Sequence, residues 1–384
     1  MVERPTTVVI LGGGIGGVAT ADHLRRRLNK RTRIVLINRD PEFTYAASYL
    51  WVMSGERQPR QVTRPLRRLE RRGIEVVVGD VTSIDPATRT VVVHGGHIEA
   101  DYLVVSLGAD DASDTVPGLD DNGFNLATLD GVQRLGQAVG GLSSGRILVV
   151  TAAAIYRCPA APYEAALLID AMLRKRDHRQ EVGIAIHAAE VGPMAVAGAN
   201  VSTAVVDLLA AREIEYHPAH QIASVVPGRV LFTDASVDDF DLLAYMPSIR
   251  PPQVIAESPL ASLDGWITTD RHTLATSFPG VYAIGDNTHT PLSIGKPLPR
   301  AGVFAHRQAL VVADNIVAAI KGRAVSASFD GKGGCFIESG FTRAGYGSGD
   351  FFAEPSPSVT VKDPSRWHHM GKVLLERHLL RRWL

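Results

Sequence analysis

An α/β fold with two mostly parallel sheets is the fold class that the sequence predicts, and three observations predict it. Two segments far apart in the chain, TTVVIL at 6–11 and RILVV at 146–150, are unbroken apolar runs rich in β-branched residues, which is typical of parallel strands covered on both faces. A segment with helical spacing and then another apolar run follow each of them, the order of a strand–helix–strand unit. The length of 384 residues exceeds one ordinary core and predicts more than one domain.

The first unit begins the chain. After the strand at 6–11 we predict a helix over 16–30 and a second strand over 33–40, which together occupy about 30 residues, as in a Rossmann-like domain. The segments IEVVVGDVTSID, TVVVHGG and ADYLVVSLGA supply further strands. A late strand, GVYAIGD, and a helix over 302–322 follow much further along, so this first domain is expected to be discontinuous.

The second unit starts at the strand RILVV and continues through a helix over 163–176 and the strand VGIAIHAA. Beyond about residue 324 the composition shifts to Gly, Ser, Phe and Pro, with little periodicity before the last twenty residues. We expect a first Rossmann-like domain in two parts, 1–110 and 241–323. A second Rossmann-like domain is expected over 111–240 and a C-terminal cap over 324–384.

Composition excludes several classes of protein. Lys plus Arg and Asp plus Glu number 40 each, so no global field favours nucleic acid. Two cysteines cannot form the disulfide framework of a small secreted domain. The chain opens on MVERP without a leader-like segment, and no apolar run of about 18 residues indicates a membrane-spanning helix. We therefore expect a folded intracellular protein that is not integral to a membrane.

A glycine-rich turn follows the first strand. Gly12, Gly14 and Gly17 have the G-x-G-x-x-G spacing between a strand and a helix, the context that makes this motif indicative of nucleotide binding. Gly12 permits the tight turn, Gly14 lets a pyrophosphate approach the backbone, and Gly17 lets the helix pack on the strand. Asn38 stands at the end of the second strand, where an acid for the ribose hydroxyls is expected; an amide can still bind a diol.

The segment FPGVYAIGDNT resembles the flavin-binding motif of flavoproteins that have two dinucleotide-binding domains. The resemblance implies that Asp286, after Gly285, hydrogen-bonds the ribityl chain of FAD. SLG at 106–108 stands where these proteins carry their middle signature, of which Gly108 is kept. FAD is therefore the cofactor that we expect.

A second glycine loop, for NADH or NADPH, is missing from the second unit. After RILVV the chain reads TAAAIYRCPAAPYE, and alanine and proline do not offer a pyrophosphate the same close approach to the backbone. A nicotinamide donor is not expected here.

The replacement segment resembles the sulfide:quinone oxidoreductases and the flavoprotein subunits of flavocytochrome c sulfide dehydrogenase. This family carries Cys-Pro-x-x-Pro-Tyr-Glu, present here from Cys158 to Glu164, and a second cysteine ahead of a Glu-containing turn, present as Cys335 and Glu338 in GKGGCFIESG. LPRAGVF is similar to the P-K-x-G segment of the family, with Arg300 for the lysine and Gly302 kept.

The resemblance implies the chemistry. Hydrosulfide would attack a Cys158–Cys335 disulfide, giving a persulfide and a thiolate, and two electrons would pass to FAD and then to a membrane quinone. Glu164 and Glu338 are candidate proton carriers. Taken singly, either cysteine has the alternative interpretation of a small buried hydrophobic residue, and either glutamate that of an ordinary helix or turn charge.

The sequence departs from the family at two positions. Ala127 stands about where many quinone-linked members have a third cysteine, and 46–48 read AAS where cytochrome-linked members attach flavin through a cysteine, so FAD is expected to be non-covalent. Three alternatives stay open: a sulfide dehydrogenase that reduces a c-type cytochrome, a type II NADH:quinone oxidoreductase (disfavoured by the missing loop), and a slow flavin-based sensor.

The last twenty residues predict a basic amphipathic helix at the inner face of the cell membrane. Trp367, Met370, Val373, Leu374 and Leu380 are expected on one side. The aromatic-rich FIESGFTRAGYGSGDFF before it is expected to border a quinone slot. The alternative is that the helix packs on the protein body or on a second subunit, and the sequence leaves a homo-oligomer open. The basic remainder comprises Arg366, Lys372, Arg377, Arg381 and Arg382.

Two further clusters carry little signal. RPLRRLERR at 64–72 is expected to be a solvated helical face, with a membrane or partner contact as the alternative. The histidines at 217, 220, 368 and 369 have no metal-site spacing, so no metal is expected.

Overall fold

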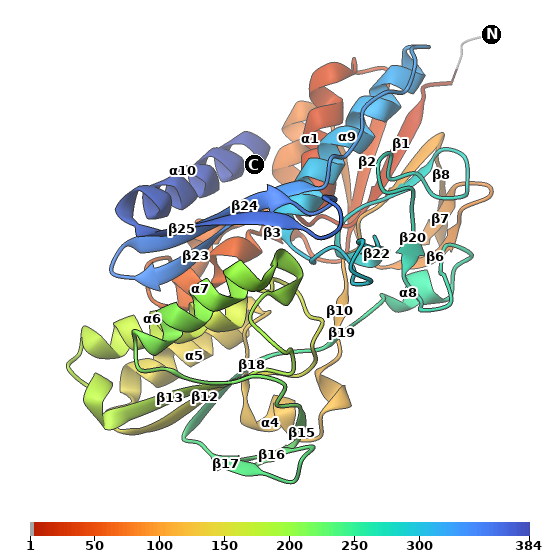
Figure 1. The fold of residues 1–384 in the computed structure, drawn as a ribbon. Helices are drawn as coiled ribbons and strands as arrows, with labels where there is room; N and C mark the ends of the chain where they lie inside the picture. The colour runs from red at the N-terminus through yellow and green to blue at the C-terminus, as the bar shows by residue number, and fades with distance from the viewer. Residues whose placement is uncertain (1–3) are drawn as a thin grey trace.

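A computed structural model describes residues 4–384 (Figure 1). Its first sheet has five parallel strands in the order β21-β9-β1-β2-β5. Because β21 lies beside β9 although almost 180 residues separate them, the first domain is discontinuous, as expected. The strands span Thr7–Leu11 (β1), Arg33–Asn38 (β2), Glu75–Val78 (β5), Tyr102–Val105 (β9) and Val281–Ala283 (β21).

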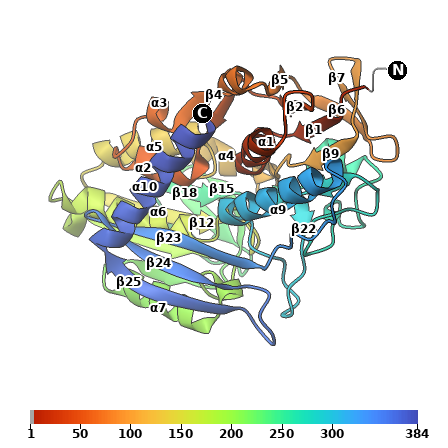
Figure 2. The same ribbon diagram turned by 90° about the horizontal axis from the view of Figure 1, so that it is seen from above.

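Helices α1 (Ile15–Arg27) and α9 (Gly302–Ile320) pack against each other on one face of this sheet (Figures 1 and 2). Val8, Ile10, Val104 and Ile316 are fully buried in the shared core. Among the described residues α9 is the helix whose length and mean hydropathy would suit a membrane span. Half of its apolar window is buried inside the protein, so α9 is a core helix of the first domain.

The second sheet is also parallel, in the order β11-β18-β12-β13-β14. Its central strand β12 (Gly145–Thr151) leads into α6 (Ala161–Arg174), which then leads to β13 (Val182–His187). The two parallel sheets with their helices confirm the predicted fold class. The remaining members of this layer are β11 (Phe124–Asn125), β14 (Glu215–His217), β18 (Leu242–Met246), α5 (Leu129–Gly141) and α7 (Ala199–Ala210).

Two antiparallel crossover strands join the domains, β10 (Asp110–Asp111) and β19 (Ile249–Arg250). The expected boundary at 110 falls on β10, and the one at 240 falls just before β18. Small elements fill the connections: β3 (Glu42–Thr44), α2 (Tyr49–Met53), α3 (Pro59–Val62), β4 (Thr63–Pro65), β6 (Val81–Asp85), β7 (Thr90–Val93), β8 (Gly96–Glu99), α4 (Leu119–Asn122), β15 (Ile222–Val226), β16 (Arg229–Phe232), β17 (Val237–Asp239), α8 (Gln253–Ala256), β20 (Ile267–Thr268) and β22 (Thr288–His289).

The C-terminal cap is a three-stranded antiparallel sheet that the sequence did not predict. Strands β23 (Lys332–Gly340), β24 (Arg343–Asp350) and β25 (Ser358–Ser365) pair in order. In Figures 1 and 2 this sheet lies between the two domains and carries the last helix, α10 (Arg366–Trp383). The sheet contacts α6 and α7 of the second domain and α9 of the first. It therefore covers the place where the domains meet.

Helix α10 is present as predicted, but two of the five apolar residues expected on its membrane side are buried instead. Val373 and Leu380 are buried against the protein, while Trp367, Met370 and Leu374 are 85%, 49% and 58% exposed. Trp383 is also buried, edge-on to Phe43 with ring centroids 5.9 Å apart. The physical reason is that one side of the helix must cover the core, so the helix has two apolar sides with different neighbours.

Candidate functional site

The glycine turn between β1 and α1 has the geometry that close backbone approach requires. Gly12 has φ +96°, and a Cβ there would lie 2.1 Å from the carbonyl oxygen of Ser106. A Cβ on Gly17 would lie 1.8 Å from the carbonyl oxygen of Gly12. A Cβ on Gly14, in contrast, would meet nothing within 4 Å. Two glycines are thus required by packing, and the third faces open space in front of the helix.

Two helix N-termini meet at this turn. A Cβ on Gly302, the first residue of α9, would lie 2.5 Å from Cδ1 of Ile15, the first residue of α1. Neither helix has an acidic residue in its first turn or a side-chain cap, so their first amide groups are available to an anion. The open space at Gly14 and these amides fit the pyrophosphate of a dinucleotide.

Other predicted cofactor residues lie around the same edge of the sheet. The side chain of Asn38 accepts a hydrogen bond from Gly13 N at 2.7 Å and donates to the carbonyl of Asp40 at 2.9 Å, so it fixes the glycine turn. Gly108 and Gly285 have φ +75° and +74° at the ends of β9 and β21. Burial raises the pKa of Asp286, and the nearby charges of Arg157 and Arg300 act in the opposite direction without cancelling the rise.

Asn287 is a residue of this edge that the sequence analysis missed. It is fully buried, and its amide donates to the carbonyls of Val105 and Ile284 at 3.4 and 3.1 Å. It thereby ties β9 to the end of β21. In the sequence, its position directly after the Gly285–Asp286 motif was the signal that could have indicated this role.

Replacing Gly17 by alanine should release FAD. The overlap with Gly12 forces α1 away from β1, and overpacking of this kind costs about 1–3 kcal/mol, so FAD affinity should fall roughly tenfold to hundredfold. Flavin content after equal dilution, measured by absorbance, tests this. Gly140→Ala is the control, because a Cβ there meets nothing within 4 Å; equal flavin content in both variants would contradict the assignment.

Cys158 lies in the loop between β12 and α6, where NAD(P)-binding folds have their second glycine turn. Its φ is +52°, in the left-handed region that non-glycine residues rarely adopt. The backbone holds it there: Cys158 N donates to the carbonyl of Arg300 at 2.8 Å. Arg300 in turn donates to the carbonyl of Asp286 at 2.9 Å and stacks 3.9 Å from the ring centre of Trp266. The cysteine is therefore anchored to the cofactor edge of the first domain.

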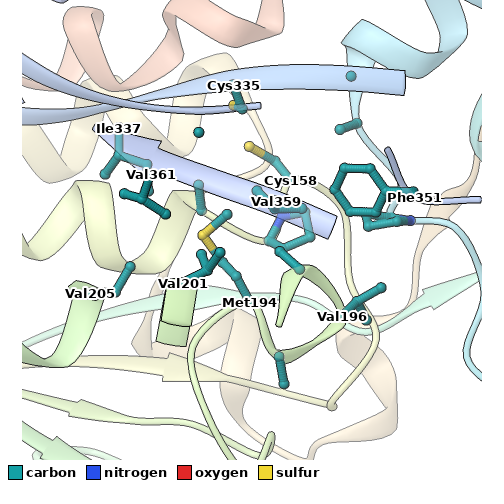
Figure 3. Close-up of a pocket in the computed structure, with 18 of the residues that line it drawn as sticks. Cys158, Met194, Val196, Val201, Val205, Cys335, Ile337, Phe351, Val359 and Val361 are labelled. Carbon is teal, nitrogen blue, oxygen red and sulfur yellow. The ribbon is translucent and has the colours of Figure 1, made fainter. Parts of the chain in front are cut away.

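Cys335 comes from β23 of the cap, and both cysteines are free thiols. Figure 3 shows the two side chains close together at one end of a cavity. The cavity measures about 660 Å³ and is lined mostly by aliphatic side chains from the second domain and the cap. Those labelled in Figure 3 include Met194, Val196, Val201, Val205, Ile337, Val359 and Val361.

Both thiols are held in the protonated form by their surroundings. Cys158 is exposed toward the cavity that it lines, but protein atoms surround its sulfur, and this burial disfavours the charged thiolate. Burial, with Cys335 and Glu164 nearby, raises the pKa of Cys158 to about 12. Burial and Glu164 also raise the pKa of Cys335. The nearby ammonium of Lys372 acts in the opposite direction on both.

A buried ionic network adjoins the two thiols. Nζ of Lys372, on α10, lies 2.7 Å from Oε1 of Glu164 on α6 and 3.9 Å from Oε1 of Glu338 on β23. Oε2 of Glu338 pairs with Nδ1 of His369 at 2.9 Å. Burial raises the pKa of Glu338 despite Lys372, whereas Glu164 and Glu338 together outweigh burial and raise the pKa of Lys372. The expectation that Lys372 belongs to the exposed basic side of the last helix is wrong. Lys372 is buried and is the cation between the two predicted proton carriers.

The acid that would bind the ribose of a nicotinamide nucleotide already accepts hydrogen bonds from hydroxyl groups of the protein. Glu190 follows β13, where an NAD-binding fold has its ribose-binding acid. Its carboxylate accepts hydrogen bonds from the hydroxyls of Tyr156, Tyr163 (2.5 Å) and Thr151 (3.0 Å). Glu164 also places a carboxylate in the first turn of α6, where it would repel a pyrophosphate. These contacts agree with the absence of a glycine loop.

This chain belongs to the pyridine nucleotide-disulphide oxidoreductase family, whose family model matches residues 6–309. Members of this family are FAD-binding flavoproteins, so the predictions of FAD and of an FAD-dependent oxidoreductase are confirmed. When bound, FAD would be held by the glycine turn, the two helix N-termini and the Gly285–Asp286 edge.

Among known proteins the chain is similar to the sulfide-quinone reductase of Aquifex aeolicus, with 27% identity over 97% of this chain and 90% of that protein. It is 22% identical to the mitochondrial sulfide:quinone oxidoreductase of Mus musculus, over 91% of this chain and 79% of that protein. The solved structure of the Aquifex aeolicus sulfide:quinone oxidoreductase superposes with a TM-score of 0.90 and 25% identity, covering 98% of this chain and 91% of that chain. The resemblance stated from the cysteine segments is therefore confirmed.

Proposed function

We propose that this protein oxidises sulfide and passes the electrons through FAD to a membrane quinone, with Cys158 and Cys335 as the redox pair. The observation that carries the proposal is the meeting of two thiols, from the β12–α6 loop and from β23, on one cavity next to the cofactor edge. The missing second glycine loop, together with a Glu190 carboxylate already bound by three hydroxyl groups, supports an electron donor other than NADH.

The sulfur chemistry balances on these two residues. Hydrosulfide attacks the disulfide of the pair, forming a persulfide on one cysteine and a thiolate on the other. A second hydrosulfide takes the outer sulfur and leaves as hydrogen disulfide anion, which returns the first cysteine to a thiol. Re-formation of the disulfide releases two electrons, which FAD would accept when bound. In total, two hydrosulfide ions give one hydrogen disulfide anion, one proton and two electrons.

The released proton has nearby acceptors. Glu338 and Glu164 share Lys372, and burial brings the pKa of Glu338 upward toward the working pH of a general acid or base. Since Lys372 also lowers the pKa of both thiols, it favours the thiolate that the first step releases. We infer that Lys372 positions the proton carriers and stabilises the thiolate.

The exposed side of α10 supports delivery of the electrons at a membrane. Trp367, Met370 and Leu374 are exposed at i, i+3 and i+7, so they lie along one stripe of the helix. An exposed apolar stripe with arginines beside it is typical of a helix that lies in the membrane interface. The placement at the inner face of the cell membrane remains part of this proposal.

Replacing Trp367 and Leu374 by serine should weaken binding to lipid vesicles on the order of 30-fold. Each substitution loses part of the free energy, about 2 kcal/mol, that burying one apolar side chain contributes. Co-sedimentation with vesicles measures this. The control is Leu263→Ser, since Leu263 is fully exposed far from α10 in the sequence. Equal binding of both variants would show that α10 is not the membrane contact.

The test of the proposed function is anaerobic addition of sulfide to the flavin-loaded protein, followed by a soluble quinone. We expect sulfide to bleach the flavin absorbance and the quinone to restore it, while NADH leaves the flavin oxidised. Sulfide that leaves the flavin oxidised would reject the proposal. Restoration by a c-type cytochrome and not by quinone would assign the cytochrome-linked alternative.

A further inference from the structure

A second hollow lies at the C-terminal end of α10, outside the site described above. It is a cleft of about 700 Å³ between α10 and the segment from α3 to the turn after β4. Figure 2 shows the end of α10 beside β4 and α3. Six arginines line the cleft against a single carboxylate, Glu376: Arg57, Arg60, Arg64, Arg68, Arg377 and Arg381.

The carboxylate does not neutralise the cleft. Glu376 accepts from Nε of Arg57 at 2.9 Å and from the hydroxyl of Ser48 at 2.6 Å, so it is already occupied. Within residues 4–384, the guanidinium groups of Arg60, Arg377 and Arg381 have neither an ion pair nor a hydrogen bond. Burial and the charge of Arg68 lower the pKa of Arg64. Arg64 and Arg68 donate to main-chain oxygens, so within the described part of the chain the three unpaired guanidinium groups that line the same cleft are the ones free to bind an anion.

We propose that this cleft binds the phosphate of an anionic lipid head group. Arginine recognises phosphate through paired N–H groups. Leu374 is one turn from Arg377, and a neighbouring hollow of α10 is lined by Leu374 together with Arg377 and Arg381. The acyl chains of a lipid bound by its phosphate would thus lie beside the exposed apolar stripe. This inference rests on the membrane delivery of electrons in the proposed function, and it adds a specific lipid class.

The test compares three triple variants of the flavin-loaded protein on vesicles of phosphatidylcholine with roughly one third phosphatidylglycerol. Arg60→Gln/Arg377→Gln/Arg381→Gln should lower the partition coefficient on the order of 100-fold, from about 1 kcal/mol per basic side chain at an anionic surface. The control Lys175→Gln/Lys321→Gln/Arg323→Gln removes the same charge from exposed positions at the ends of α6 and α9 and should lose less than about threefold.

The third variant carries lysine at the same three cleft positions. It keeps the charge but loses the paired N–H groups, so we expect an intermediate loss of severalfold. Equal loss in the cleft and control variants, or no loss with lysine, would show diffuse attraction and overturn the site. Two results would overturn the assignment to a lipid. One is saturable binding of inorganic phosphate, without vesicles, with a dissociation constant below about 1 mM. The other is binding of a DNA duplex as tight as binding of the vesicles. Bleaching by sulfide without vesicles tests the proposed function separately.

Discussion

Replacing either Cys158 or Cys335 by serine is expected to lower the rate of flavin bleaching by sulfide on the order of 10³-fold or more. A serine hydroxyl cannot form the disulfide or the persulfide, so both steps of the sulfur chemistry are lost. Stopped-flow absorbance at a fixed sulfide concentration measures the rate. Because both cysteines are small side chains on the wall of the same cavity, the substitutions should leave the fold and flavin binding unchanged.

The controls separate a lost reaction from a lost cofactor. Dithionite should still bleach the flavin of both variants, since it does not need the thiols. A matched change on the same cavity wall, Val361→Ala, alters an exposed apolar residue and should keep the rate within about threefold. If one cysteine variant bleaches as quickly as the unmodified protein, the two thiols do not act as a pair.

The wild-type pH profile carries a second signature of the pair. The pKa of Cys158 is raised to about 12 in the free-thiol state, so the reduced pair is largely protonated at neutral pH. Flavin reduction that starts from the two thiols should therefore accelerate as the pH rises from 7 to 10, with no plateau in that range. Single-turnover measurements over this range test it. A plateau beginning below pH 8 would mean that the thiols ionise far more readily.

The first domain could be predicted in detail because its signals are local. The strand at 7–11, the glycine turn and α1 are adjacent in sequence, and the steric need for Gly12 and Gly17 is one that the motif spacing already indicates. The Gly285–Asp286 end of β21 was found by resemblance, as were the two cysteines. The approach of the two cysteines in space could not be read from any local pattern, because residues 158 and 335 are 177 positions apart in the chain.

The three strands of the cap were missed for a physical reason. Strands β23 and β24 read KGGCFIESG and RAGYGSGD, and glycine-rich segments have low strand propensity and no clear alternation. They form strands here because each pairs with its neighbour and β23 also packs on α6. The spacing of residues within one helix likewise could not show which of the five basic residues on α10 is buried against the protein. Lys372 pairs with a carboxylate about 200 residues away, and no local pattern contains that information.

Replacing Lys372 by methionine should have the largest effect on stability. Lys372 is 9% exposed and Glu338 is 1% exposed, and removing one partner of a buried ionic network leaves carboxylates without a cation, which costs about 3–5 kcal/mol. Denaturant unfolding at pH 7 measures the free energy of unfolding. The matched control is Arg377→Met on the exposed side of α10, which should change the stability by less than about 0.5 kcal/mol.

The pH dependence of that loss has a definite sign. In the unmodified protein the pKa of Lys372 is raised, so its stabilising contribution is full below the ordinary lysine pKa of about 10.4 and is lost only as the pH rises through the higher folded value. In Lys372→Met, Glu338 loses the cation that opposes the effect of burial, so its raised pKa rises further. The stability contribution of Glu338 is then present at low pH and is lost as the pH rises through that raised pKa.

The methionine variant should therefore be closest to the unmodified protein near pH 5 and furthest from it near pH 8. Adding Glu164→Gln to Lys372→Met should restore more than half of the lost stability, because one buried charge is removed together with its partner. If Lys372→Met is as stable as Arg377→Met at pH 8, the three groups do not form a buried ionic network. The role of Lys372 beside the thiols would then fall with it.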